Sequence, residues 1–265
     1  MTRWMVCLVI ILAPLSLLIA GPERGDDSHA DEIVVGRFTT PGKELPEGWK
    51  EQTFDPEKIP VASVYEQVRM GDQVVLKGTT RKGASLVYRP VDVNWRKHPV
   101  LAWRWRVDQV FEKQDERSKA GDDFPARIYI GFKYDPSRVN WFTRRAFEKA
   151  RRASKDGSYP PLYSLTYVWA TKEPVNTAYS NPYQDRAKMV VVRSGTEGLK
   201  TWHAETRDYA KDFRAIVGED PPEVEFVAIM IDGDNTGSSG VCYFADIRFL
   251  PRMPRTDKAQ PPKEK

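Results

Sequence analysis

Cysteine is almost absent from this chain, which has two cysteines in 265 residues. Cys7 lies in an N-terminal apolar segment that we expect to be removed, so Cys242 is left without a partner in the same chain. This count excludes a disulfide framework and a cysteine-based zinc site. The fold must therefore be stabilised by its own hydrophobic core. Cys242 lies in an apolar stretch, and we expect a buried, unreactive thiol there.

Histidine is also scarce, with three residues, and the common catalytic motifs are missing. The sequence has no Gly-x-Ser-x-Gly elbow, no His-Glu-x-x-His pair and no phosphate-binding loop, so the enzyme classes built on those motifs are not expected. A glycoside hydrolase or lyase remains possible, because such an enzyme needs only two carboxylates at a suitable distance. The sequence offers Asp122, Asp123, Asp232 and Asp234 for such a pair.

Neither sign of charge dominates, since 41 Lys and Arg residues face 37 Asp and Glu residues for a net charge of +4. Domains that bind nucleic acid are typically far more basic, so we expect no nucleic-acid partner. The mild positive balance is compatible with an exported protein that meets anionic glycans or lipid headgroups.

Long apolar runs are confined to the N-terminus, where Trp4–Ala20 is almost entirely apolar. Ser28-His29-Ala30 places small residues at the two positions that a signal peptidase selects. We therefore predict a signal peptide over residues 1–30, a mature chain that starts at Asp31, and export to the periplasm or cell envelope. Cleavage after Ala20 and retention of the run as a membrane anchor are the alternatives, since its length approaches that of a membrane span.

Alternation of apolar and polar residues, the pattern of a half-buried β-strand, dominates the rest of the chain. In Leu101–Val107 the side chains of Trp103 and Trp105 fall on one face, and those of Arg104 and Arg106 fall on the other. Gly, Pro, Asn and Asp separate about eleven such segments. The predicted strands are residues 33–38, 49–54, 63–69, 73–79, 85–90, 101–107, 126–132, 163–169, 188–193, 224–231 and 241–250.

Two segments show helical spacing instead. Ser137–Lys155 places apolar residues, among them Phe142 and Phe147, on one face and basic residues on the other. Glu205–Val217 is the second, and it stops before a glycine.

These patterns predict an all-β single domain over residues 31–250, a two-sheet jelly-roll-like sandwich with two short helical insertions. Residues 251–265 are rich in proline and charge, which is typical of a disordered C-terminal tail.

Five ordered motifs resemble one bacterial family. They are Leu101-Ala-Trp-Arg-Trp105, Gly121-Asp-Asp-Phe-Pro-Ala-Arg-Ile-Tyr129, Tyr167-Val-Trp-Ala170, Asp232-Gly-Asp-Asn-Thr-Gly237 and Ala245-Asp-Ile-Arg-Phe249. Together they look like the exported family catalogued as domain of unknown function 3047. The resemblance implies an exported single domain and brings no established activity or catalytic residues. The last motif is also loosely similar to the final strand of jelly-roll carbohydrate-binding modules, a likeness of fold that does not give function.

Asp232, Asp234 and Asn235 lie together between two strong strand patterns. Clustered oxygen ligands on a turn suit calcium, and Asp246 on the returning strand would join them if the hairpin paired suitably. The same loop would offer hydrogen bonds to sugar hydroxyls. The simpler interpretation is an ordinary hairpin turn, in which Asp, Asn and Gly are the usual residues. The candidate calcium ligands are therefore Asp232, Asp234 and Asp246.

Arg104, Arg106 and Arg127 each fall on the polar face of a predicted strand. If those strands are neighbours, the arginines form a cluster beside Tyr129 that would bind a carboxylate or sulfate through paired hydrogen bonds. The alternative is a solvated face with cross-strand ion pairs. The candidate ligand-binding residues are Arg104, Arg106, Asp123, Arg127 and Tyr129.

These features favour a non-catalytic ligand-binding module with a carbohydrate or an acidic glycan as its ligand. A carbohydrate-active enzyme that uses the aspartates is the second hypothesis. The third is an envelope protein whose basic helix contacts anionic lipid or a partner. A helix packed on the sandwich with a solvated basic face explains the same helical pattern without a membrane. The sequence leaves the oligomeric state open.

Overall fold

The computed structural model describes residues 31–112, 115–154 and 156–254. The chain divides into residues 1–30 and a compact unit of residues 31–265, which holds every described helix and strand. The predicted signal peptide lies outside the described residues, and so does the predicted tail from residue 255 onward. No helix in the described part is long and apolar enough to cross a membrane.

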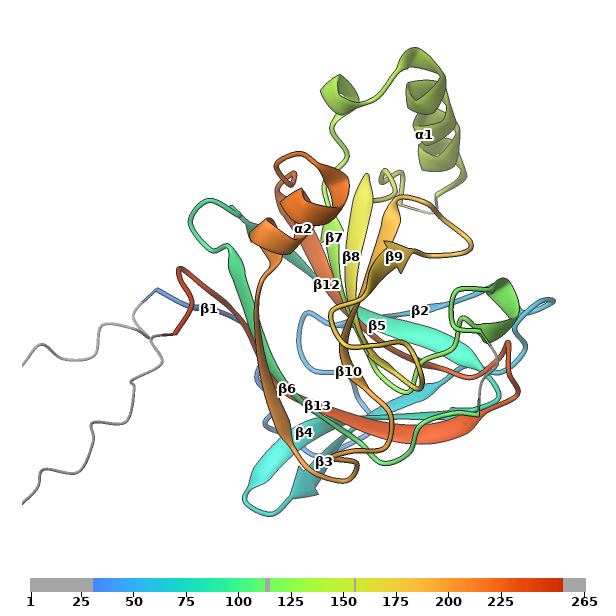
Figure 1. Cartoon of the computed structure of the whole chain (residues 1–265), viewed down its shortest axis with the longest axis vertical. Helices are drawn as coiled ribbons and strands as arrows, with labels where there is room; N and C mark the ends of the chain where they lie inside the picture. Colours follow the sequence, from blue (N-terminus) through green and yellow to red (C-terminus); the bar gives the residue numbers. More distant parts are fainter. Residues whose placement is uncertain (1–30, 113–114, 155, 255–265) are drawn as a thin grey trace, which may run out of the picture. The chain divides into compact units, whose positions relative to one another are not determined.

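The described residues of this unit form two β-sheets (Figure 1). The first sheet has the order β11-β6-β13-β4-β3, with β1 paired to β13, and the second has the order β2-β5-β12-β7-β8-β10-β9. The first sheet contains β1 (Ile33–Gly36), β3 (Val64–Met70), β4 (Gln73–Arg81), β6 (Val100–Val107), β11 (His203–Asp208) and β13 (Ser239–Leu250). The second contains β2 (Lys50–Thr53), β5 (Ala84–Val93), β7 (Arg127–Phe132), β8 (Tyr163–Ala170), β9 (Ala178–Ser180), β10 (Ala187–Ser194) and β12 (Val224–Asp232).

The pairings between these strands are antiparallel, except that β8 and β10 run parallel. Strands that are adjacent in a sheet are often distant in sequence: β6, for example, lies between β11 and β13. The predicted fold class, an all-β two-sheet sandwich with two helical insertions, is confirmed.

The predicted helix Glu205–Val217 is wrong at its start. Residues His203–Asp208 form β11, which pairs with β6 along its whole length. Helix α2 (Tyr209–Val217) begins only after Asp208, whose side chain accepts a hydrogen bond from the Lys211 amide at 2.9 Å and caps the helix. The polar sequence of β11 lacks the apolar alternation that would have marked it as a strand.

The hydrophobic core lies between the two sheets. Trp103 on β6 stacks on Tyr167 of β8 with ring centroids 5.3 Å apart, and the centroids of Trp105 and Trp169 on the same two strands are 5.9 Å apart. All four rings are buried, as the alternation predicts. Cys242 on β13 is also buried, which confirms the buried thiol expected there, and burial raises the pKa of that thiol well above the ordinary value.

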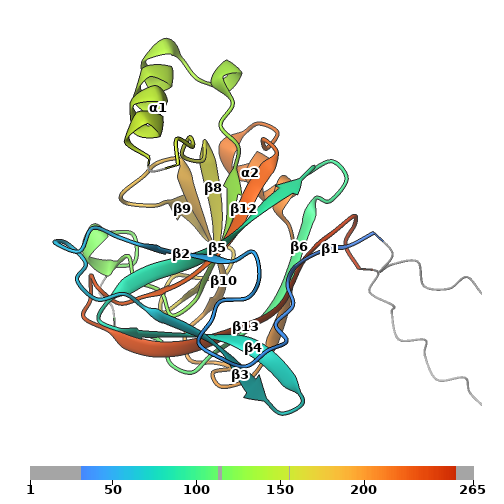
Figure 2. The ribbon, with the colours of Figure 1, turned by 180° about the vertical axis from the view of Figure 1, so that it is seen from behind.

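Helix α1 (Trp141–Ala153) follows β7 and stands at one end of the second sheet (Figures 1 and 2). Asn140 caps its first turn. Its buried residue is Phe147, whose ring stacks on Tyr134 with centroids 4.5 Å apart. The prediction that Phe142 joins the packed face is wrong, because 76% of that residue is exposed.

Candidate functional site

Arg127 is the first residue of β7 and is almost fully buried. Its Nε donates to Asp232 Oδ1 at 2.9 Å, and its Nη1 donates to Asp122 Oδ1 at 3.1 Å. Its Nη2 donates to Asp232 Oδ2 and to the Asp122 carbonyl. Asp232 ends the neighbouring strand β12, and Asp122 lies in the loop before β7. A guanidinium is tolerated in such a buried position because each nitrogen finds an oxygen.

Two further carboxylates lie beside this ion pair. Carboxylate oxygens of Asp123, Asp232 and Asp234 all lie within 4.8 Å of one another. Burial raises the pKa of Asp232 to about 7; Arg127 opposes this rise, and Asp123 adds to it. Burial and the charge of Asp123 also raise the pKa of Asp234. Negative charge exceeds positive charge here, so at neutral pH the cluster favours either a held proton or a bound cation.

Asp123 anchors the turn between β12 and β13. One of its oxygens accepts from the Asn235 amide at 3.2 Å and from Asn235 Nδ2 at 3.0 Å. The other accepts from the Thr236 amide and the Thr236 hydroxyl, both at 2.6 Å. A buried carboxylate with two hydrogen bonds at each oxygen holds a loop in shape and is out of reach of a substrate. The geometry therefore does not support Asp123 and Asp232 as an acid–base pair.

Asp246 is not part of this cluster, so the prediction that it joins Asp232 and Asp234 is wrong. β12 and β13 belong to different sheets, and the returning strand therefore leaves the turn instead of pairing with β12. Asp246 lies seven residues beyond Ser239, about 23 Å along an extended strand, and its carboxylate pairs with Arg104. Asp123 lies beside the other two in its place, and the predicted calcium site at Asp232 and Asp234 stays a prediction.

The predicted arginine cluster is not assembled. Arg104 and Arg106 lie on β6 in the first sheet, whereas Arg127 lies on β7 in the second. Arg104 pairs with Asp246, and Arg106 Nε donates to Asp108 Oδ1 at 2.8 Å. The arginines of β6 therefore fit the alternative interpretation, a partly solvated face with ion pairs.

Tyr129 points away from the core on the outer face of the second sheet, between the core residues Ile128 and Ile130, as the alternation predicts. Strand register places it in a row of directly paired residues that crosses the sheet: Tyr88 on β5, Ala228 on β12, Tyr129 on β7, Thr166 on β8, Met189 on β10 and Tyr179 on β9. Its three tyrosines are partly exposed. We name Tyr88, Tyr129, Thr166 and Tyr179 the tyrosine row.

Two hydroxyls of the tyrosine row, Thr166 Oγ1 and Tyr179 Oη, have no hydrogen-bond partner among the described residues. The Tyr129 hydroxyl donates to Met230 Sδ at 3.3 Å, and sulfur is a weak acceptor. A buried hydroxyl without a partner costs about 1–3 kcal/mol, so native proteins seldom leave one unless it serves a further role. Both unpartnered hydroxyls are buried, so the row exposes parts of its three tyrosines and not the Thr166 hydroxyl.

The sequence-based prediction misses Tyr88, Thr166 and Tyr179. Alternation does mark Thr166 as outward-facing, since Leu165 and Tyr167 on either side of it are core residues. β9, which carries Tyr179, is only three residues long and gives no pattern of its own. What unites the row is strand pairing, which alternation within single strands does not reveal.

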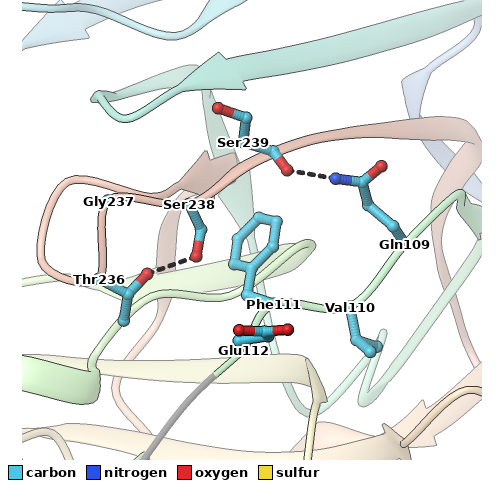
Figure 3. A pocket seen from close by; sticks show the side chains of 8 residues that line it. All are labelled: Gln109, Val110, Phe111, Glu112, Thr236, Gly237, Ser238 and Ser239. Carbon is cyan, nitrogen blue, oxygen red and sulfur yellow. Dashed lines mark hydrogen bonds between the residues drawn. The ribbon is translucent and has the colours of Figure 1, made fainter.

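A pocket of about 560 Å³ lies against the turn that Asp123 anchors (Figure 3). The Thr236 hydroxyl donates to Asp123 and accepts from the Ser238 hydroxyl, 2.7 Å away, so this wall of the pocket is tied to the buried cluster. The pocket is lined by Gln109, Val110, Phe111, Glu112, Thr236, Gly237, Ser238 and Ser239. Its lining offers amide, hydroxyl and carboxylate groups around one aromatic ring.

The model of a family described as a protein of unknown function, DUF3047, matches residues 47–248. The chain belongs to this family. That match confirms the resemblance carried by the five motifs, and it adds no activity. None of the curated proteins matches the chain.

Among solved structures, the chain is similar to a family 11 carbohydrate-binding module from Clostridium thermocellum in complex with a β-1,3-1,4-mixed-linked tetrasaccharide, with 11% identity, 83% of this chain and 95% of that chain covered, and a TM-score of 0.39. It is also similar to the xyloglucanase domain of NopAA from Sinorhizobium fredii, with 9% identity, coverages of 80% and 98%, and a TM-score of 0.38. The looser resemblance to jelly-roll carbohydrate-binding modules thus recurs as a likeness of fold. At these identities and TM-scores it carries no information about ligand or activity.

Proposed function

We propose that this protein is a non-catalytic ligand-binding module that binds a carbohydrate across the tyrosine row. The observation that carries the proposal is the alignment of three partly exposed tyrosines, Tyr88, Tyr129 and Tyr179, which strand pairing places in one row across the second sheet. A sugar ring presents flat C–H faces and many hydroxyls. Aromatic rings pack against the former, and polar groups at the edge of a binding face form hydrogen bonds with the latter.

The ligand of this face is expected to be neutral. Arg127 lies on the same face, but each nitrogen of its guanidinium donates to an oxygen of Asp122 or Asp232. The arginines of β6, which lie on the first sheet, are paired with the carboxylates of Asp246 and Asp108. The acidic glycan that the arginine cluster suggested is therefore the less favoured ligand, because no arginine of that set is available to form a bidentate pair with it.

Calorimetric titration of residues 31–265 with a panel of soluble β-glucans, xylans and galactans tests the proposal, since this unit contains the whole described core. We expect saturable binding to one class, and we expect Tyr129→Ala to weaken it at least about tenfold. Tyr243→Ala is the matched control, because Tyr243 is also a partly exposed strand tyrosine but lies on β13 of the first sheet.

Each other outcome of this titration has a defined meaning. No binding across the panel would overturn the carbohydrate assignment. Equal weakening of binding by Tyr129→Ala and Tyr243→Ala would show that the ligand does not bind at the tyrosine row. New reducing ends after overnight incubation would overturn the non-catalytic assignment and favour the hypothesis of a carbohydrate-active enzyme.

We also propose that the module works outside the cytoplasm, in the periplasm or cell envelope. The apolar run Trp4–Ala20 and the small residues of Ser28-His29-Ala30 support this. The full-length chain, produced in a Gram-negative host and fractionated, should appear in the periplasm with Asp31 as its first residue. An intact Met1 on protein recovered from the cytoplasm would contradict the proposal.

A further inference from the structure

Helix α1 is held to the sandwich along one side only. Its buried residue Phe147 stacks on Tyr134, which in turn stacks on Tyr159 with centroids 4.5 Å apart. The Asn140 side chain accepts a hydrogen bond from the Thr143 amide at 2.9 Å and fixes the first turn. Figures 1 and 2 show the helix standing clear of the strands beyond the end of the second sheet. The opposite face of a firmly anchored helix is therefore left to solvent.

That exposed face has an unusual composition. Trp141, Arg145, Lys149 and Arg152 follow one another at spacings of four, four and three residues, so they form one stripe along the helix. Phe142 lies next to the start of the stripe. Trp141 is 59% exposed and Phe142 is 76% exposed, and their rings meet edge to face with centroids 5.0 Å apart. Two large aromatic residues side by side in solvent are uncommon in a soluble protein and indicate a surface that contacts something.

The charge of α1 is strongly one-sided. The helix carries five basic residues and one acidic residue, Glu148, a net charge of +4. Glu148 is turned toward the body, where it accepts hydrogen bonds from Arg151 and Tyr159. Within the described part of the chain, Arg145, Lys149 and Arg152 form no ion pair, and the Arg145 guanidinium lies 4.8 Å from the centroid of the Trp141 ring. Glu148 interacts electrostatically with Arg152 but forms its ion pair with Arg151, so the exposed stripe carries a net positive charge.

We propose that the exposed face of α1 binds an anionic phospholipid surface. Trp141 and Phe142 suit the headgroup region, where aromatic side chains gain from partial burial, and the three cations of the stripe suit the lipid phosphates around them. Each basic residue near an anionic bilayer adds to the attraction, and the aromatic pair adds a contribution that salt does not screen. This combination matches a charged surface with an apolar interior, which is the chemistry of a membrane.

Co-sedimentation with vesicles tests the proposal. Residues 31–265 are the protein of choice, because the apolar run Trp4–Ala20 would itself partition into lipid. We expect binding to vesicles of equal parts phosphatidylglycerol and phosphatidylcholine and little binding to phosphatidylcholine alone. The triple variant Arg145→Glu, Lys149→Glu, Arg152→Glu should lower the partition coefficient at least about tenfold. The double variant Trp141→Ala, Phe142→Ala should lower it as well, and the binding that remains should be abolished by high salt.

The triple variant Lys43→Glu, Lys50→Glu, Lys58→Glu is the matched control. It makes the same change in net charge at exposed positions in the segment around β2, away from α1. Normal unfolding midpoints for all variants would show that the fold is intact. The proposal is overturned if the wild-type unit does not bind anionic vesicles, if the control variant loses as much binding as the α1 charge variant, or if the aromatic variant binds as well as the wild type.

Discussion

Arg127 and Asp232 form a buried ion pair that joins the start of β7 to the end of β12, the strand beside it. Both residues are at most 2% exposed. The pair lies where two loops meet the sheet, so the charges that stabilise it also decide how those loops are held.

Removal of Arg127 should be strongly destabilising. Arg127→Ala leaves Asp122 and Asp232 buried without their cation, so we expect the free energy of unfolding to fall by about 3–5 kcal/mol in urea denaturation. Lys133→Ala is the control, because it removes an exposed pair with Asp92 and should cost less than about 1 kcal/mol. Equal losses in the two variants would show that the buried pair has no special weight.

Stability should depend on pH through Asp232. Its pKa is raised from the ordinary 3.8 to about 7, so between these values the folded state keeps a proton that the unfolded state releases. The contribution of this group to stability is therefore fully present below about pH 4, declines as pH rises toward 7, and changes no further above that. Asp232→Asn cannot titrate and should flatten this part of a profile of urea midpoints. Parallel profiles for the two proteins would contradict the raised pKa.

Calcium should stabilise the protein if the cluster of Asp123, Asp232 and Asp234 binds a cation. A ligand that binds only the folded state raises the melting temperature, and the stabilising free energy grows with the logarithm of the ligand concentration above the dissociation constant. We expect a rise with millimolar calcium at pH 8 that chelation reverses and that Asp234→Asn abolishes. Asp246→Asn is the control, because Asp246 pairs with Arg104 on the other sheet. A melting temperature that does not change with calcium would refute the cation hypothesis. A proton held by Asp232 would then be what offsets the excess negative charge of the cluster.

Thr166→Val should separate stability from binding. The variant removes a buried hydroxyl that has no partner, so we expect the free energy of unfolding to stay equal or to rise by about 1 kcal/mol. Carbohydrate affinity should stay unchanged, because Thr166 is fully buried and out of reach of a ligand. Thr80→Val is the control, because the buried Thr80 hydroxyl donates to the Gly83 carbonyl at 2.6 Å and its loss should destabilise the protein. A loss of affinity in Thr166→Val would contradict this and show that the ligand reaches the buried hydroxyl.

Alternation predicted which residues face the core, because that depends only on position within one strand. Trp103, Trp105 and Trp169 are buried and Tyr129 faces outward, as expected. Strand order was beyond reach, since pairing is set by contacts between distant segments. The sequence therefore did not reveal that Arg106 and Arg127 lie on different sheets.

The aspartate cluster shows the same limit at the level of single side chains. Asp122 and Asp123 are neighbours in sequence, yet one binds Arg127 and the other anchors Thr236. Asp246 lies at an irregularity of β13 and has a φ of 53°, which no alternation pattern announces. Helical spacing likewise identified the segment of α1, but the side that meets the sandwich depends on Tyr134, so the position of Phe142 was misjudged.

Cys242 is a natural chemical probe for unfolding of this protein. It is the only cysteine in residues 31–265, and it lies on β13 between β4 and β6, hydrogen-bonded strands on either side. An alkylating reagent can reach the thiol only when the core between the two sheets opens. The labelling rate of the native protein, compared with that of the unfolded chain, therefore reports the fraction of molecules open at any moment. No engineered label or mutation is needed to follow the opening of this core.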